Sequence, residues 1–280
     1  MNSQTAKPSL TEVLTESVRN IAGTIGVLGG ISFITGYLIV NFYLTQYGVA
    51  TLNLVQSRYF ASGALYLIVS VLVCGAPFAS IYTAEQLSKA EHETHTRKLM
   101  PALIGASFLL SVLICWACGI VLVSADRFTP FAKSITERQY SIWLALPASE
   151  IAILFPFFVY LITKRALKNK TPTQTSSGAI WLPATFAVLF TICFIISTVV
   201  FSRFVYANTS PSVGGGAPII VQLVVAESLS SIQSFPLKIN GGITEKVILI
   251  DHSGSELVVL QLENSQVIEI SDNQVLSILH

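Results

Sequence analysis

The chain has 280 residues, of which 52% are hydrophobic and only 11% are charged, and its formal net charge is +1. Soluble globular domains carry about 25% charged residues, so the composition excludes an ordinary soluble protein. The small net charge gives no electrostatic basis for binding nucleic acid.

The N-terminal segment precedes a series of apolar runs. Ser9 and Glu12 have the spacing of a helix-capping box, and apolar residues follow at helical intervals. We therefore expect residues 1–20 to form a short amphipathic segment on the membrane surface.

Five apolar runs follow, each close to the length of about 20 residues that crosses a bilayer. They cover residues 21–43, 59–82, 101–124, 141–163 and 179–202. Aromatic residues at their ends suit the two membrane interfaces. The pattern predicts an α-helical integral membrane protein with five transmembrane helices, whose membrane domain extends over 21–203.

Lysine and arginine residues are divided unequally between the two sets of loops. The N-terminal segment and the second and fourth loops hold nine, whereas the first loop, the third loop and the exit of the last span hold five. The positive-inside rule then predicts a cytoplasmic N-terminus and, after five spans, an extracytoplasmic C-terminal domain.

The first span is rich in glycine, and Gly26 and Gly30 form a GxxxG motif that permits close helix approach. The partner is either another span of the same chain or a second subunit. The loop after this span, 44–58, is apolar enough to form an interfacial helix, with Arg58 reaching toward the headgroups.

Two short motifs resemble sequences of known proteins. The first is Asn41-Phe42-Tyr43-Leu44, followed by Tyr47-Gly48-Val49 and Arg58-Tyr59. The second is Gly214-Gly215-Gly216-Ala217-Pro218, followed by Val221-Gln222-Leu223. Together they resemble uncharacterised bacterial multi-pass membrane proteins with a GGGxP-linked C-terminal β domain, although these often carry a basic residue in place of Ala217. The resemblance implies the bacterial inner membrane and no assigned activity.

These motifs supply two sets of candidate site residues. The interfacial set is Asn41, Tyr43, Arg58 and Tyr59, and the tail set is Gly214, Gly215, Gly216 and Pro218.

Glu150, in the fourth apolar run, is the only Asp, Glu, Lys, Arg or His inside any of the five runs. Ionisable groups in hydrocarbon are costly and mark functional sites. At similar depth the other spans place neutral residues, Thr35, Tyr66, Cys115 and Thr191. Three alternatives remain open for Glu150: a structural hydrogen-bonding role, the lining of an aqueous path for a cation or proton, and contact with a small ligand.

The C-terminal part changes composition. Residues 204–216 read as a polar, glycine-rich linker, and 217–280 as a small β-rich domain, either a barrel or a sandwich. The expected strands are Ile219–Val225, Lys246–Ile250, Leu257–Leu262, Val267–Ile270 and Val275–Leu279, with a short helix at Ser228–Phe235. Asp251-His252-Ser253 is expected to be part of a turn.

The leading functional expectation is an oligomeric, channel-like or transport-related assembly with Glu150 lining the path. The alternative is a non-conducting sensor or scaffold whose tail binds a protein or envelope ligand. The spans contain no paired carboxylates and no Ser/His or Cys/His set, so we expect no enzyme, metal site or cofactor. The expected partners are the lipid bilayer, further copies of the chain and an unidentified protein, but not nucleic acid.

Overall fold

The computed structural model describes residues 10–49, 57–90, 94–126, 129–168, 176–225, 237–253 and 256–279. Within these ranges, five helices are long and apolar enough to cross a membrane, and they coincide with the five expected apolar runs. They are α1 (Leu10–Leu44), α2 (Ser57–Ala90), α3 (Thr94–Ser124), α4 (Ile135–Lys168) and α5 (Ser176–Val200). Only 22% to 39% of each span is buried within the chain, so most of the apolar surface is available to lipid.

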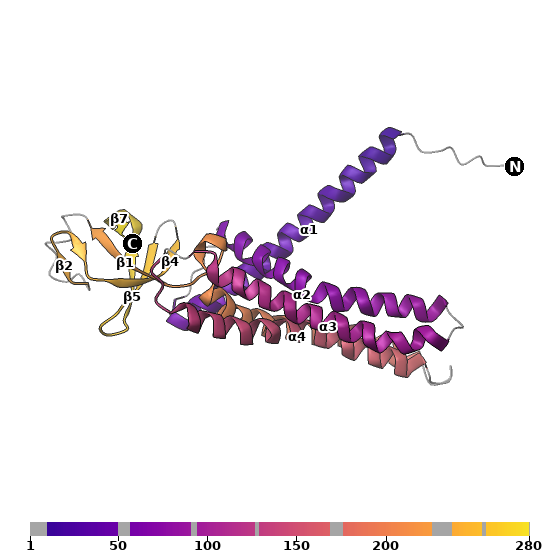
Figure 1. The fold of residues 1–280 in the computed structure, drawn as a ribbon. Coiled ribbons are helices and arrows are strands. Elements are labelled where there is room, and N and C mark those ends of the chain that lie inside the picture. The colour runs from indigo at the N-terminus through magenta and orange to yellow at the C-terminus, as the bar shows by residue number, and fades with distance from the viewer. Residues whose placement is uncertain are drawn as a thin grey trace.

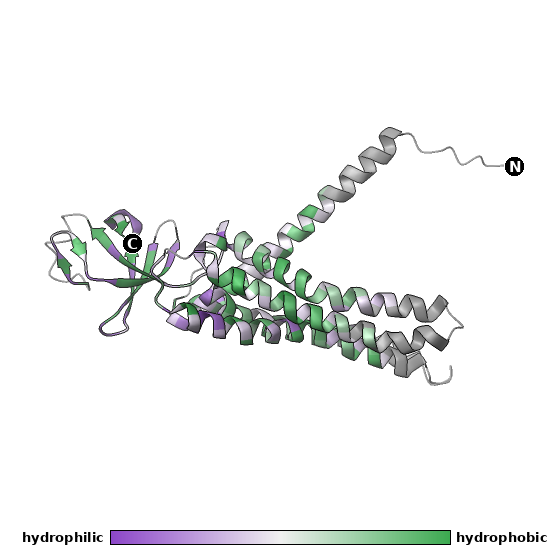
Figure 2. Cartoon of the chain, in the orientation of Figure 1, coloured by the Kyte–Doolittle hydropathy of each residue, from purple (hydrophilic) through white to green (hydrophobic). Residues whose placement is uncertain are grey.

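The helices α2 to α5 form an elongated bundle, whereas the N-terminal part of α1 diverges from it (Figure 1). Hydrophobic residues predominate in the middle of the bundle, and a more mixed colouring marks the tail (Figure 2). The expected surface segment within 1–20 is not a separate helix, because α1 begins at Leu10 and continues without a break to Leu44. Residues 1–9, which include Ser9 of the capping box, lie outside the described ranges.

The C-terminal half of α1 packs closely on α2 at a pair of glycines. A Cβ at Gly36 would overlap the carbonyl oxygen of Tyr59, and a Cβ at Gly63 would overlap that of Ser32. By contrast, nothing in the described structure lies within 4 Å of a Cβ placed at Gly26 or Gly30. The close approach within the chain is therefore made at Gly36 and Gly63, not at the GxxxG motif.

The link from α1 to α2 begins with a single 3₁₀ turn, Thr45–Tyr47, which ends at Gly48 in the left-handed conformation (φ 72°). Glycine adopts this conformation without steric cost. An interfacial helix is expected over 44–58, but Ser57 and Arg58 already belong to α2. Residues 50–56 of that range lie outside the described ranges.

The tail is a single antiparallel sheet in the order β2-β3-β1-β4-β5-β6, with β7 paired to β1. The strands are β1 (Ile219–Val225), β2 (Ile239–Asn240), β3 (Ile243–Thr244), β4 (Val247–Ser253), β5 (Glu256–Gln261), β6 (Val267–Ser271) and β7 (Val275–Leu279). The expectation of a barrel is wrong, since the described strands β6 and β7 are not paired and the sheet stays open. The expected helix at Ser228–Phe235 lies outside the described residues.

The central strand β1 shows why this sequence forms a half-buried sheet. Its residues alternate strictly between buried and half-buried positions, as a strand with one covered face requires. Val221 and Leu223 are buried with residues of the neighbouring strands, such as Leu257 and Ile270. The β2–β3 hairpin turns at Gly241 and Gly242, both with positive φ, as tight hairpin turns demand.

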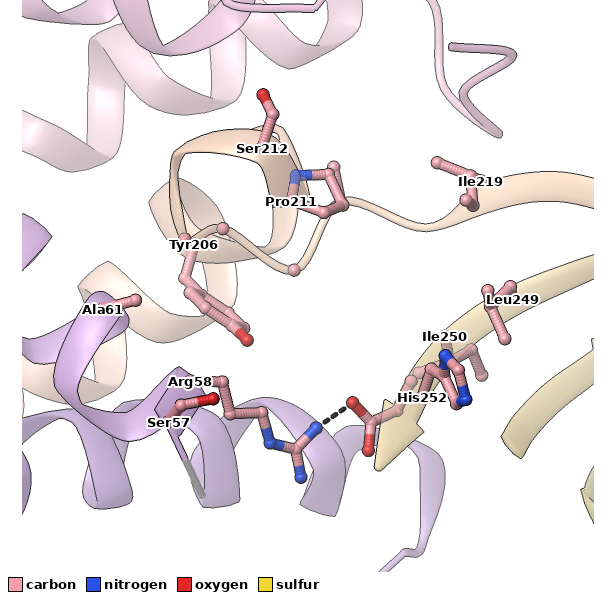
Figure 3. Close-up of a pocket in the computed structure, with 15 residues that line it drawn as sticks. Ser57, Arg58, Ala61, Tyr206, Pro211, Ser212, Ile219, Leu249, Ile250 and His252 are labelled. Carbon is pink, nitrogen blue, oxygen red and sulfur yellow. Dashed lines mark hydrogen bonds and ion pairs between the residues drawn. The ribbon is translucent and has the colours of Figure 1, made fainter. Parts of the chain in front are cut away.

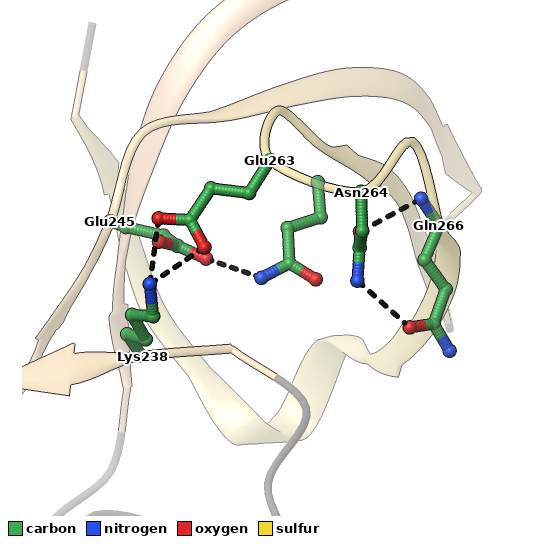
Figure 4. Close-up of polar contacts among 6 residues, drawn as sticks. Lys238, Glu245, Glu263, Asn264 and Gln266 are labelled. Atoms are coloured by element: carbon green, nitrogen blue, oxygen red, sulfur yellow. Dashed lines mark hydrogen bonds and ion pairs between the residues drawn. The ribbon is translucent and has the colours of Figure 1, made fainter.

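Polar contacts hold the outer end of the tail (Figure 4). Lys238 donates to both carboxylate oxygens of Glu263 at 2.6 Å, and this hydrogen bonding raises the pKa of Lys238 above its ordinary value. Gln261 donates to Glu245 at 2.7 Å. These contacts surround the β5–β6 turn, in which Ser265 has a φ of 55°.

Candidate functional site at the junction of the membrane domain and the tail

Glu150 lies buried between two helices of the bundle, with 2% of its surface exposed. Ser70 donates to one carboxylate oxygen at 3.1 Å, and the Cys74 thiol donates to the other at 3.2 Å. Both partners belong to α2, one helical turn apart, so the side chain connects α4 to α2. These contacts favour the structural alternative for Glu150.

The residues expected at the depth of Glu150 have different surroundings. Tyr66 shares a hydrogen bond of 2.7 Å with Ser197 of α5, one turn of α2 before Ser70. Cys115 is buried, and Thr35 is 1% exposed with a hydroxyl that has no hydrogen-bond partner in the described structure. Thr191 is exposed and donates to the carbonyl of Ala187, so the structure does not bring it to Glu150.

The tail lies at the end of the bundle where α1 ends and α2 begins (Figure 1). The loop between α3 and α4 also reaches it. Ala132 donates its amide to the Pro218 carbonyl at 3.0 Å, and Ile220 donates to the Pro130 carbonyl at 2.7 Å. This pairing places Phe131 opposite Ile219 in an antiparallel bridge. The membrane domain therefore contributes backbone to the sheet of the tail.

Residues 201–218 join α5 to β1, and we call this segment the connector. It is packed against its neighbours, although its composition suggested a linker. It continues α5 as a π-helical turn, Phe201–Val205, followed by 3₁₀ turns at Tyr206–Asn208 and Pro211–Val213. Residues 205–210 are all buried. π-helical turns inside helices are frequent at functional sites, and this one directs the chain toward the tail.

The three glycines of the tail motif lie against this segment. A Cβ at Gly216 would overlap the ring of Tyr206, and one at Gly215 would overlap the backbone of Thr209. Gly214 has a φ of 84° and its carbonyl accepts a hydrogen bond of 3.1 Å from Ser62 of α2. The motif is therefore glycine-rich because α2 and its own connector approach it from both sides.

The interfacial motif separates into two groups. Asn41 donates to the carbonyl of Tyr37 in its own helix at 2.9 Å, and Tyr59 is fully buried against the ring of Phe33, at 5.8 Å between centroids. These two residues support helix packing. Arg58 instead faces the tail, and the ring of Tyr43 packs edge-on against Tyr206, in the segment that leads to the tail, at 5.2 Å.

Arg58, the second residue of α2, forms an ion pair with Asp251 of β4. The expectation of a turn at Asp251 is wrong, because β4 continues to Ser253 and pairs with β5 throughout. The register shifts between Leu249 and Asp251, which identifies a β-bulge at Ile250. Bulges redirect the side chains next to them, and here Asp251 is directed at the membrane domain.

A cavity of about 480 Å³ surrounds this ion pair. Its wall is shared by the start of α2, the glycine-rich connector and the end of β4 (Figure 3). The side chain of Arg58 extends across it toward β4, and the hydroxyl of Tyr206 points toward Arg58 (Figure 3). The other polar side chains in the wall are Ser57, Ser212 and His252.

A second cavity, of about 300 Å³, lies between α4 and α5 and is lined mainly by apolar residues such as Pro156, Tyr160 and Phe186. None of the described residues in its wall is charged. Glu150 lines neither of these two cavities.

Arg138 is a junction residue that sequence reasoning used only for orientation. It is 1% exposed, donates from Nε to the Asn208 carbonyl at 2.8 Å, and lies over the ring of Phe131 at 3.7 Å. Its position ties the first turn of α4 to the connector. The signal available in the sequence is an arginine in the first turn of α4, just before the apolar run 141–163.

Asp251 and Tyr206 are further site residues that sequence reasoning missed. Asp251 comes directly after an apolar strand in the sequence, and an acidic residue at such a place is the signal that a partner lies beyond the sheet. Nothing in the sequence indicates that the partner is Arg58, which is 193 residues away.

Comparison of the chain with protein-family models, with curated proteins and with solved structures finds no match. The resemblance of the two motifs to bacterial membrane proteins therefore stays a prediction. A function for this chain has to be inferred from the geometry of the junction.

Proposed function

We propose that this chain is a non-conducting sensor of the bacterial inner membrane, with a ligand-binding cavity shared by the membrane domain and the tail. The supporting observation is the cavity around Arg58 and Asp251, whose wall comes from both parts. A ligand in that cavity contacts α2 and β4 at once. Its binding would shift the equilibrium between arrangements of the tail on the bundle, because only differential contacts can shift such an equilibrium.

The orientation of the chain belongs to this proposal. The excess of lysine and arginine in the N-terminal segment and the second and fourth loops supports a cytoplasmic N-terminus. The cavity would then lie on the extracytoplasmic side, where a ligand of the cell envelope can reach it. Self-association would use the face of α1 that carries Gly26 and Gly30.

The conducting assembly has less support. That hypothesis requires Glu150 to face water, whereas both of its carboxylate oxygens accept hydrogen bonds from α2. We therefore place a channel-like function second.

Native mass spectrometry of the full-length protein, purified from membranes in detergent, tests the sensor proposal. We expect the wild type to carry a small-molecule adduct. Ser57→Trp should lose the adduct, because Ser57 lines the cavity and its side chain is directed toward Arg58 (Figure 3). Val213→Trp is the control, because Val213 is exposed on the neighbouring 3₁₀ turn and does not line the cavity.

Proteoliposomes provide the opposing measurement. The sensor proposal predicts no ion flux in wild-type protein. A wild type without adduct that passes ions, with flux abolished by Glu150→Gln, would contradict the proposal and favour conduction.

A further inference from the structure

The geometry points to a phosphate group as the chemistry that this cavity binds. Arg58 would hold the phosphate, and Asp251 would accept a hydrogen bond from an amine or hydroxyl of the same ligand. This inference rests on the proposed function, because it specifies the ligand of the same cavity.

The guanidinium of Arg58 is only partly used within the protein. Nη1 donates to Oδ1 of Asp251, whereas Nε and Nη2 are buried and have no acceptor among the described residues. Nε and Nη2 form one edge of the planar guanidinium, and their N–H bonds point the same way. That edge is the two-pronged donor that matches phosphate and carboxylate oxygens.

Asp251 lacks a hydrogen-bond donor, whereas Arg58 lacks acceptors. Its side chain is 10% exposed, and Oδ2 has no donor in the described structure. A buried charged group without its full set of hydrogen bonds is costly. A ligand that offers both an oxyanion and an N–H or O–H group satisfies both residues, whereas a simple anion satisfies only Arg58.

The other wall residues do not supply these missing partners. His252 is engaged with Asp272 at 3.0 Å on the exposed side of the sheet. Ser212 is paired with Ser210 at 2.9 Å. Arg58 and Asp251 both line the cavity of about 480 Å³, and the unpaired edge of Arg58 and the unpaired oxygen of Asp251 lie just below its surface within the described structure.

The location of the pair narrows the source of the phosphate. Arg58 stands at the beginning of an apolar helix, at the depth where arginine side chains meet lipid headgroups. A phospholipid with a primary amine in its headgroup carries the phosphate and the donor together. A soluble phosphate ester of an amine has the same chemistry, and the experiment separates the two sources.

The test uses delipidated full-length protein in detergent, with native mass spectrometry as the readout. The probes are phosphatidylethanolamine, phosphatidylcholine and soluble phosphoethanolamine. We expect one phosphatidylethanolamine to be retained and phosphatidylcholine to be retained less, because the choline nitrogen has no N–H for Asp251. If phosphoethanolamine displaces the lipid at equal concentration, the ligand is a soluble phosphate ester of an amine rather than a phospholipid. The cavity would still bind it through its phosphate group.

Three variants accompany these probes. Arg58→Lys keeps the charge but lacks the planar donor edge, and should weaken retention about tenfold, the loss typical of removing a charge-assisted hydrogen bond. Asp251→Asn should remove the preference for ethanolamine over choline. Arg203→Lys is the control, since Arg203 is exposed near the same end of the bundle and does not line the cavity.

Two results would overturn the inference. One is equal retention of both lipids by the wild type and by Arg58→Lys, with phosphoethanolamine failing to bind. The other is a cavity adduct, lost in Ser57→Trp, that contains no phosphorus. The second result leaves the sensor proposal standing, whereas absence of any adduct together with Glu150-dependent flux removes both.

Discussion

Gly216 occupies a place in the cavity wall that any larger side chain would disturb. Its Cα faces the ring of Tyr206, and this ring in turn packs against Tyr43. Gly216, Tyr206 and Tyr43 therefore form a continuous packed contact from the connector to the end of α1. Its neighbour Gly215 is confined in the same way by Thr209.

Gly216→Ala should lower the stability of the full-length protein by about 1–3 kcal/mol, the usual cost of inserting a methyl group into a packed site. The thermal unfolding midpoint in detergent measures this change. Gly105→Ala serves as the control, because nothing lies within 4 Å of a Cβ at this position in α3. Equal unfolding midpoints for the two variants would contradict the prediction, because they would mean that the connector accommodates the methyl group without loss of stability.

At this scale, the sequence singles out residues with an unusual chemistry, but it does not indicate which distant residue each of them contacts. Glu150 and Arg58 stand out because charge is rare in and beside apolar helices. Asp251 resembles a turn residue because the bulge at Ile250 has no signature in the sequence. The partners of Glu150, Ser70 and Cys74, escape notice because small polar side chains are common in spans.

Among the elements, α1 and α2 make a contact that depends on two glycines as well as on aromatic side chains such as Phe33 and Tyr59. Gly36 and Gly63 bring the two backbones together, and Ser32 donates to the Phe60 carbonyl at 3.1 Å across the same interface. Close approach of this kind is a main source of helix association in lipid, where burial of apolar side chains gives little.

Gly36→Ala should separate α1 from α2 locally and lower stability by about 1–3 kcal/mol, since the added methyl group meets backbone that cannot rotate away. The matched variant is Gly30→Ala in the same helix, where the space is open. Unfolding in detergent compares them. A larger loss for Gly30→Ala would mean that the GxxxG face makes the principal contact, as it would in a dimer.

The type of each element is predictable because hydrophobic length and period determine it. The five spans emerge from runs of about 20 apolar residues, and the ends of β1 and β7 agree with the expected Ile219–Val225 and Val275–Leu279. Closure of the sheet is not predictable, because it depends on long-range pairing. The edge of β1 next to β7 is occupied by the loop at Pro130–Ala132, which belongs by sequence to the membrane domain.

Across the whole molecule, this strand pairing joins parts that sequence analysis treats as separate domains. Phe131 and Ile219 face each other as a non-hydrogen-bonded pair between the two flanking amide bonds. Such pairs bring Cα atoms to about 4.5 Å, within the range that a disulfide spans.

Phe131→Cys combined with Ile219→Cys should therefore cross-link on oxidation of the full-length protein in membranes. The four native cysteines are first replaced, and a protease site in the loop between α4 and α5 separates the halves on a reducing or non-reducing gel. Phe131→Cys with Ile243→Cys is the control, since Ile243 pairs with Val224 farther along β1. Cross-linking of the control alone would contradict the docked arrangement.

The participation of residues 130–132 in the sheet also sets an order of events during synthesis. This loop leaves the ribosome before α4 and α5, whereas β1 is made after both of them. When β1 is synthesised, residues 130–132 are already held between α3 and α4. The first strand of the tail can therefore pair with a backbone segment that is already in place. A tail expressed alone would keep the pairing among its own strands but would lack the bridge between Ile219 and Phe131.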